Sequence, residues 1–269
     1  MKEKFEHKKS LGQHFLNSDY VPKKMCDAAA IEAGDIVLEI GPGTGVLTRE
    51  ILLRGGRVIA IEADARAITE LQSTFPKEIS NHQLVIHHHD ARTLDLEEFG
   101  LKHGSFKVVS NIPYYLSGFL FRTILESNCQ PNTLVFLIQK EVAERIARDE
   151  KESLLSLSIE VFGEPSYICT VKKGHFTPPP KIDSAIVAIN NISRDKFNDF
   201  SSELFFKVIH LGFAQKRKQL LGNLSSEFDR EELKHIFTEL GLPLDIRAED
   251  IKLNTWLNLI NIINHRFIH

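Results

Sequence analysis

Seven short runs rich in β-branched residues constrain the fold of this chain more than any other feature. They alternate with stretches whose apolar residues recur at helical spacing, which is typical of a parallel sheet joined by crossover helices. We therefore expect an α/β fold with a seven-stranded sheet. The predicted strands are 36–40, 57–62, 84–88, 106–110, 134–139, 166–171 and 182–189, and the predicted helices between them are 46–54, 65–75, 118–127 and 141–148.

The last two predicted strands are joined by residues 174–181, which contain Pro178-Pro179-Pro180. Proline fixes φ and lacks an N–H, so this segment is extended and cannot be helical. We expect the two strands to form an antiparallel pair that closes the sheet. The sheet with its helices, preceded by a basic arm of residues 1–20, is expected to form a first domain of residues 1–190.

After Asn190 the pattern becomes helical only, which predicts a small all-helical domain of residues 191–269. One long helix is expected over 203–221. Asp229 is expected to cap a second helix that Gly241 ends, and Asn254 is expected to cap the last one.

Composition limits the classes of function. A net charge of −3 argues against a protein that coats nucleic acid indiscriminately, although local basic clusters can still contact RNA. No stretch approaches the roughly 18 consecutive apolar residues of a membrane span, so we expect a soluble protein with no membrane partner. The three cysteines are scattered without metal-ligand spacing, which indicates a reducing compartment, the cytoplasm. With no self-association stripe in the sequence, we expect a monomer.

A glycine-rich loop, Glu39-Ile40-Gly41-Pro42-Gly43-Thr44-Gly45, directly follows the first predicted strand and opens a helix. An open α/β sheet binds nucleotide-like ligands at this place. Gly41 and Gly43 let the backbone approach such a ligand because they carry no Cβ. A dinucleotide fingerprint would have glycine at position 46, where this chain has Val46. The loop therefore favours a ligand with an uncharged methionine and ribose moiety over a pyrophosphate.

Acidic residues follow the next two strands at the same edge of the sheet. Glu62 ends the second strand, and its two carboxylate oxygens match the cis-diol of a ribose. Asp90 follows the third strand, in position to accept a hydrogen bond from an adenine amino group. His87, His88 and His89 precede it, but neighbouring strand residues point to opposite faces, so we expect no metal site.

Asn111-Ile112-Pro113-Tyr114 follows the fourth predicted strand, at the edge that carries the glycine loop. The amino nitrogen of an adenine is a poor nucleophile because its lone pair is delocalised into the ring. Acceptors aimed at its hydrogens favour its tetrahedral form, and the Asn111 side-chain oxygen and a carbonyl beside the rigid Pro113 are suited to this. Tyr114 would stack on a base that has left its helix or loop. The run predicts an acceptor site for an amino nitrogen on a base.

Together these motifs resemble the ribosomal RNA adenine N6-dimethyltransferase family, and within it the bacterial small-subunit branch whose loss gives kasugamycin resistance. The resemblance covers essentially the whole chain. It implies a Rossmann-like methyltransferase fold, S-adenosyl-L-methionine as cofactor, and dimethylation of N6 of two adjacent adenosines in the 3′-terminal loop of 16S rRNA in the immature small subunit. Besides the motifs above, it rests on residues 9–16, 139–142, 176–185 and 247–249.

The resemblance also assigns residues. Phe176 would face Tyr114 across the target base, and His14 stands where many members have asparagine. From their charge alone, independently of the resemblance, we expect the basic N-terminal arm and the segment Lys216-Arg217-Lys218 to contact phosphates of the RNA. The catalytic residues would be Asn111, Pro113, Tyr114 and Phe176, and the cofactor contacts would fall on His14, Leu16, Gly41, Gly43, Glu62, Asp90 and Asn111.

Two alternatives remain open. A large-subunit rRNA adenine dimethyltransferase of the macrolide-resistance type would share the glycine loop and the Asn111 run, whereas residues 177–180 and 247–249 favour the small-subunit branch. The second alternative is a non-catalytic ribosome assembly factor on the same fold. The intact set of site residues speaks against it.

Overall fold

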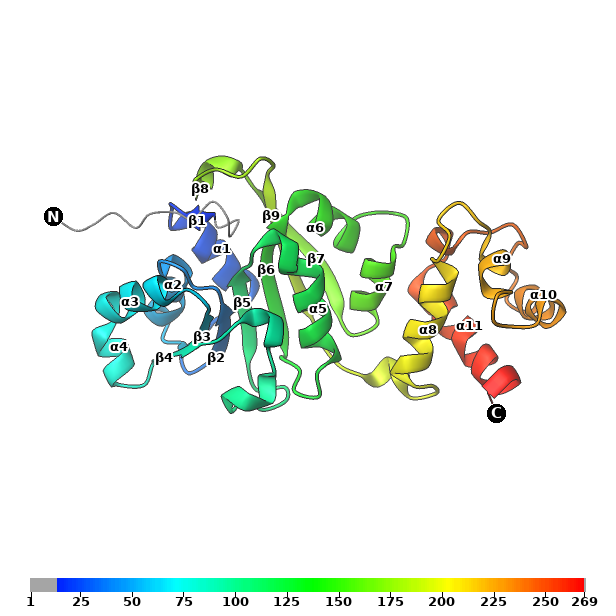
Figure 1. The fold of residues 1–269 in the computed structure, drawn as a ribbon, viewed down its shortest axis with the longest axis horizontal. Coiled ribbons are helices and arrows are strands. Elements are labelled where there is room, and N and C mark those ends of the chain that lie inside the picture. The colour runs from blue at the N-terminus through cyan, green and yellow to red at the C-terminus, as the bar shows by residue number, and fades with distance from the viewer. Residues whose placement is uncertain (1–13, 269) are drawn as a thin grey trace. The chain divides into compact units, whose positions relative to one another are not determined.

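The computed structural model describes residues 14–268 and contains a seven-stranded sheet with the order β4-β3-β2-β5-β6-β9-β7 (Figure 1). β9 runs antiparallel to both of its neighbours, and the other adjacent pairs are parallel. All seven predicted strands are present to within two residues, and the antiparallel closing pair is confirmed. The bounds are β2 Ile36–Ile40, β3 Arg57–Glu62, β4 Leu84–His88, β5 Lys107–Asn111, β6 Thr133–Gln139, β7 Glu164–Val171 and β9 Ser184–Asn190.

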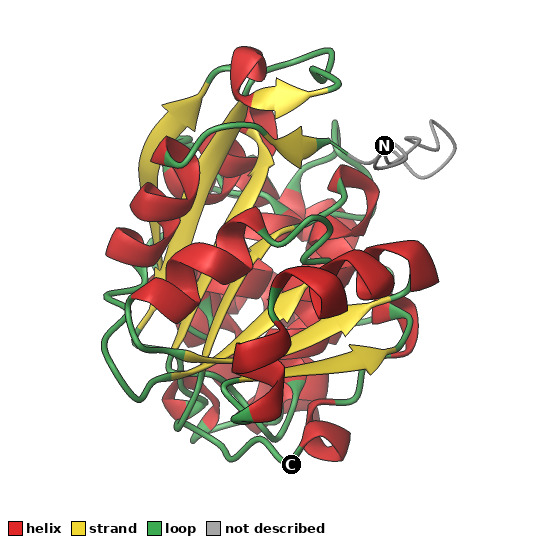
Figure 2. Cartoon of the chain, turned by 90° about the vertical axis from the view of Figure 1, so that its left-hand side faces the viewer, coloured by secondary structure: helices red, strands yellow, loops and turns green. Residues whose placement is uncertain are grey.

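The chain changes direction across the sheet at β2, which lies between β3 and β5. From β2, the strands β3 and β4 are added toward one edge of the sheet, and β5 and β6 are added toward the other edge. Right-handed crossovers therefore place α2 (Val46–Leu53) and α3 (Ala65–Thr74) on one face and α5 (Ser117–Glu126) on the other. Helices are visible on both faces in Figure 2. Because both faces are covered, the central strands are almost continuously apolar.

β2 and β5 separate before they end. Their register pairs Val37 with Lys107 and Leu38 with Val108, and both strands then continue. The N–H of Ile40 donates instead to the Ser110 hydroxyl, at 2.8 Å, so a buried donor keeps a partner where the ladder stops. The separation opens the sheet at the carboxyl ends of its central strands, where doubly wound folds bind ligands.

Several elements were not predicted. β1 (Phe15–Leu16) pairs antiparallel with β8 (Phe176–Thr177), which joins segments more than 150 residues apart in sequence. Next to this pair, the N–H of Asn17 donates to the His175 carbonyl at 3.0 Å. The helices α1 Tyr20–Ala28 and α4 Pro76–Ser80 were not predicted either, whereas α6 Lys140–Ala147 matches the predicted helix 141–148 to within one residue.

A second compact unit comprises residues 145–163 together with the chain from Ser193 onward. The expected helical domain of 191–269 left out residues 145–163. They belong to this unit because the N–H of Glu152 donates to the Glu249 carbonyl at 2.8 Å and its carboxylate pairs with Lys252 at 2.9 Å. Its helices are α7 Leu154–Glu160, α8 Ser202–Gly212, α9 Leu220–Leu224, α10 Arg230–Glu239 and α11 Leu253–Ile263.

Two helix predictions in this unit are wrong in detail. The long helix over 203–221 is broken between α8 and α9, and the Asn223 side chain donates to the Gly212 carbonyl at 2.5 Å, which satisfies the end of α8. The last helix has Lys252 at its N-cap position, not Asn254. The Asp229 cap is confirmed, since its carboxylate accepts from the N–H of Glu232 at 2.9 Å. Within residues 14–268, no helix combines the length and apolarity that crossing a membrane requires.

Candidate active site

A cavity of about 470 Å³ lies at the carboxyl ends of β2, β3, β4 and β5. It is formed entirely by the unit that contains the sheet. Every residue that the sequence assigned to a site borders it, with the exception of Phe176. The assigned residues that line the cavity are His14, Leu16, Gly41, Gly43, Glu62, Asp90, Asn111, Pro113 and Tyr114.

Gly43 and Gly45 of the glycine loop have positive φ angles and lie close to aromatic side chains. Gly43 has φ 57°, and a Cβ on it would lie 2.8 Å from the Phe15 ring. Gly45 has φ 78°, and a Cβ there would lie 2.6 Å from the Phe75 ring. A side chain at either position would therefore meet both backbone strain and a steric clash. Phe15 was not among the predicted site residues.

Glu39, the first residue of the loop motif, is 1% exposed and points at the helix that the loop opens. Its carboxyl accepts a hydrogen bond from the Thr48 hydroxyl at 2.7 Å. Burial raises the pKa of Glu39 to about 8, so that the side chain is mainly a neutral acid at pH 7. Glu39 thus joins β2 to α2 across the loop without placing a charge in the interior.

Glu62 is 5% exposed, and both of its oxygens accept backbone hydrogen bonds. Oε2 accepts from the N–H of Gly43 at 3.2 Å, and Oε1 accepts from the N–H of Asp64 at 2.8 Å. Burial raises the pKa of Glu62, and these hydrogen bonds oppose the rise. A carboxylate oxygen has a second lone pair, so both oxygens can still receive a ribose hydroxyl.

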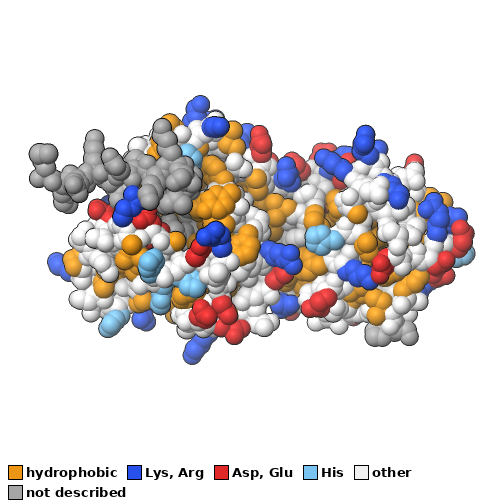
Figure 3. Space-filling model, in the orientation of Figure 1, with side chains coloured by type: hydrophobic (Ala, Val, Ile, Leu, Met, Phe, Trp, Pro, Cys, Tyr) orange, Lys and Arg blue, Asp and Glu red, His pale blue; other side chains and the backbone are white. Residues whose placement is uncertain are grey.

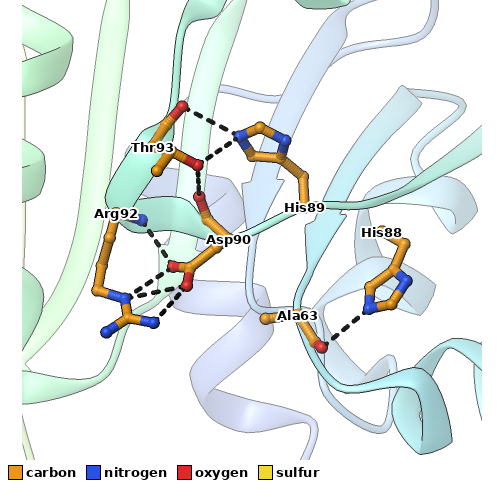
Figure 4. A network of polar contacts seen from close by, with 6 residues as sticks. All are labelled: Ala63, His88, His89, Asp90, Arg92 and Thr93. Carbon is orange, nitrogen blue, oxygen red and sulfur yellow. Dashed lines mark hydrogen bonds and ion pairs between the residues drawn. The ribbon is translucent and has the colours of Figure 1, made fainter.

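The Asp90 carboxylate is engaged by Arg92, a contact that the sequence analysis missed (Figure 4). It accepts from the Arg92 N–H at 2.9 Å and from the guanidinium, with Nη2 2.5 Å from Oδ2. These bonds hold the pKa of Asp90 down at about 2. An aspartate side chain commonly forms a turn by accepting from the N–H two residues later. An arginine at that second position was the sequence signal that could have predicted this contact.

Of the three histidines next to Asp90, His87 and His89 share an aromatic neighbour and His88 has a different contact. His88 faces the Ala63 carbonyl at 3.1 Å, and His89 faces the Thr93 carbonyl at 3.1 Å (Figure 4). His87 and His89 both pack edge-on against Phe99, with centroids 5.0 and 5.4 Å away. The expected alternation of neighbouring side chains is thus visible.

Asn111 is oriented by the β1 segment. Its Nδ2 donates to the His14 carbonyl at 3.2 Å, and within residues 14–268 no hydrogen bond to its Oδ1 is recorded. His14 in turn donates from Nδ1 to the Pro178 carbonyl at 2.8 Å. The pairing of β1 with β8 therefore leaves the Asn111 oxygen available as an acceptor in the cavity.

Tyr114 is half-buried and fixed at its hydroxyl, which lies 2.7 Å from the Ser184 hydroxyl on β9. Burial raises its pKa. Its ring lies 5.8 Å from the His14 ring. Phe176, which was predicted to face Tyr114, does not line the cavity: it is 2% exposed and packs in the hydrophobic core, where β8 pairs with β1.

The fold and site are those of a Rossmann-like methyltransferase. A solved dimethyladenosine transferase from Plasmodium falciparum superposes with a TM-score of 0.80 at 26% identity, covering 94% of this chain and 98% of that one. The 23S rRNA methyltransferase ErmE shares the fold, with a TM-score of 0.72 at 22% identity and coverage of 91% and 98%.

Residues 4–265 match the family described as ribosomal RNA adenine dimethylase. A protein named ribosomal RNA small subunit methyltransferase A from Dehalococcoides mccartyi is 38% identical over 94% of this chain and 87% of its own length. A protein of the same name from Fusobacterium nucleatum is 34% identical, with coverage of 97% and 99%. The chain belongs to the ribosomal RNA adenine dimethylase family, and it is an enzyme of that class.

Proposed function

We propose that this enzyme transfers methyl groups from S-adenosyl-L-methionine to N6 of two adjacent adenosines in the 3′-terminal hairpin loop of 16S rRNA, late in assembly of the small subunit. One observation carries the proposal: a single cavity joins the glycine loop, Glu62 and Asp90 to the Asn111–Tyr114 run. A donor and an acceptor bound at these two groups of residues would therefore share one space. The relatives named small subunit methyltransferase A support the choice of RNA.

The cofactor half of the cavity fits an adenosine-containing sulfonium. S-adenosyl-L-methionine supplies an activated methyl group when it is bound. Gly41 and Gly43 present backbone without side chains, and the buried Glu62 offers two oxygens to a ribose diol. Arg92 donates to both oxygens of Asp90, so an adenine amino group would take the place of the Arg92 guanidinium at one of them. His14 and Leu16 close the cavity on the side of β1.

The acceptor half positions the adenine amino group. The Asn111 Oδ1 would accept from one of its hydrogens, and a carbonyl beside Pro113 from the other, which favours the tetrahedral nitrogen. The hydroxyl bond to Ser184 fixes the Tyr114 ring on which the target base would stack. No general base is needed before the transfer, so alignment supplies most of the acceleration and the proton leaves afterwards to water.

For the RNA surface we propose the basic arm of residues 1–20 and the exposed segment Lys216-Arg217-Lys218, both acting on phosphates. Residues 1–13 of the arm lie outside the described part of the chain. We further propose that the enzyme acts as a monomer. We also propose a cytoplasmic location, because the three cysteines are scattered in the sequence without metal-ligand spacing.

The test is methyl transfer from labelled cofactor to purified small subunits that lack the modification, followed by nucleoside analysis. We expect N6-dimethyladenosine in 16S rRNA at two neighbouring positions, located by primer extension. Methylation confined to large-subunit RNA would support the macrolide-resistance alternative instead. Binding to immature subunits without any transfer would indicate a non-catalytic assembly factor.

A further inference from the structure

Two aromatic side chains remain exposed beside the cavity. Tyr115 is 67% exposed and Phe119 is 43% exposed. Leaving such rings in water is unfavourable, because an aromatic ring removes more apolar surface from water on burial than most side chains do. Among the residues that the structure describes, neither ring has an aromatic partner. Tyr115 borders the cavity, and Phe119 follows it four residues later in the chain without lining the cavity. Leu53 on α2 is an exposed apolar side chain that does not line the cavity either.

The two rings share one face of the chain. Tyr115 belongs to the short helical turn before α5, and Leu116 and Ser117 continue it in the right-handed helical conformation. Residues four apart on such a segment are neighbours. The opposite face is buried by Leu120 and other apolar residues of α5. Between the rings in sequence, Gly118 leaves the surface open, since a Cβ there would meet no atom within 4 Å.

This face continues from the cavity, because Tyr115 also lines it. The arginines near the rings, Arg92 and Arg122, have side chains that are 69% and 67% exposed. Each is paired with a carboxylate, Asp90 and Glu126 respectively, so these pairs put no net negative charge on the face to repel a phosphate. Figure 3 shows hydrophobic and basic side chains adjoining one another over α5.

We propose that Tyr115 and Phe119 form a stacking platform for the nucleotide next to the target adenosine. The inference rests on the proposed function and extends it to a second base. When the target base enters the cavity, its neighbour loses a stacking partner and, being covalently attached, must lie at the rim. An exposed aromatic ring there restores the stacking, and it does so for any base because every base has a π face.

The kinetic test compares Tyr115→Ala/Phe119→Ala with the wild-type enzyme on small subunits that lack the modification. We expect the KM for subunits to rise about tenfold, the usual effect of losing base–aromatic stacking, with the dissociation constant of the cofactor unchanged. Tyr115→Trp should retain a KM near that of the wild type, and Tyr115→Leu should not, because leucine offers apolar contact without a π face. Leu53→Ala is the matched control, an exposed apolar side chain away from the cavity.

A spectroscopic test reports stacking directly. The probe is a hairpin RNA with 2-aminopurine next to a single target adenosine. Its fluorescence should stay quenched on binding to the wild type and brighten on binding to the double alanine variant.

The outcomes separate the two proposals. If the wild type forms no dimethyladenosine in 16S rRNA, the proposed function fails. If the wild type is active but the double variant has an unchanged KM, or if 2-aminopurine is equally bright with both proteins, the platform is refuted. Equal KM values for the Tyr115→Leu and Tyr115→Trp variants would also refute stacking.

Discussion

The buried carboxyl of Glu39 should make the stability of this protein fall as the pH rises. Its pKa in the folded state is about 8, whereas its ordinary value is 4.5. Between these values the folded protein holds a proton that the unfolded chain has released. The contribution is therefore complete below about pH 4.5 and is lost as the pH rises through about 8. The slope is about 1.4 kcal/mol for each pH unit, and the total loss is about 5 kcal/mol.

Glu39→Gln isolates this effect because glutamine keeps the shape and an acceptor for the Thr48 hydroxyl but cannot ionise. We expect the variant to match the wild type near pH 5 and to exceed its free energy of unfolding by about 4 kcal/mol at pH 8. Urea unfolding followed by circular dichroism measures both proteins across this range. Tryptophan fluorescence is unsuitable, since the single Trp256 lies in the other compact unit.

The control for this experiment is the same substitution at the exposed Glu98, for which we expect no pH-dependent difference from the wild type. If the stability curves of Glu39→Gln and the wild type run parallel between pH 5 and 8, the argument for a neutral buried acid is wrong.

Three further predictions concern the site and the second unit. Asn111→Ala should lower kcat for methyl incorporation about 100-fold or more while binding to immature subunits persists, and normal activity would refute the assigned role. Glu62→Ala should weaken cofactor binding in calorimetry about 10- to 100-fold, because two hydroxyl bonds to a charged group are lost; an unchanged dissociation constant would exclude Glu62 as the ribose ligand. Gly212→Ala should destabilise the helical unit by about 1–3 kcal/mol, since the new Cβ would lie 2.4 Å from Trp256. Trp256 fluorescence during urea unfolding measures this, and an unaltered midpoint would contradict the close packing.

The sheet and its ligand-binding edge were predictable because their signals are local. Each strand is a short apolar run, and the glycine loop, Glu62, Asp90 and Asn111 each follow a strand directly. In a parallel sheet the carboxyl ends of strands meet at one edge, so strand assignments alone bring these residues together. The structure places all of them around the same cavity.

The contacts that depend on long-range pairing were not predictable in this way. β1 and β8 are two residues long and carry no periodicity that could be read from the sequence. Their pairing determines that the His14 carbonyl reaches Asn111 and that Phe176 is buried in the core. The resemblance to a family supplied these residues as members of a site, but it did not supply their side-chain environments.

The engagement of Asp90 by Arg92 shows that a local signal can also be missed when function is assigned one residue at a time. The sequence predicts Asp90 as an acceptor for a ligand, and its carboxylate already accepts from a side chain two positions away. Arg92 also borders the cavity beside Tyr115. The same guanidinium thus touches the predicted adenine acceptor and lies at the rim where we place the neighbouring base. Arg92 would then lie between the bound cofactor and the RNA. The position of functional residues at strand ends does not predict this role.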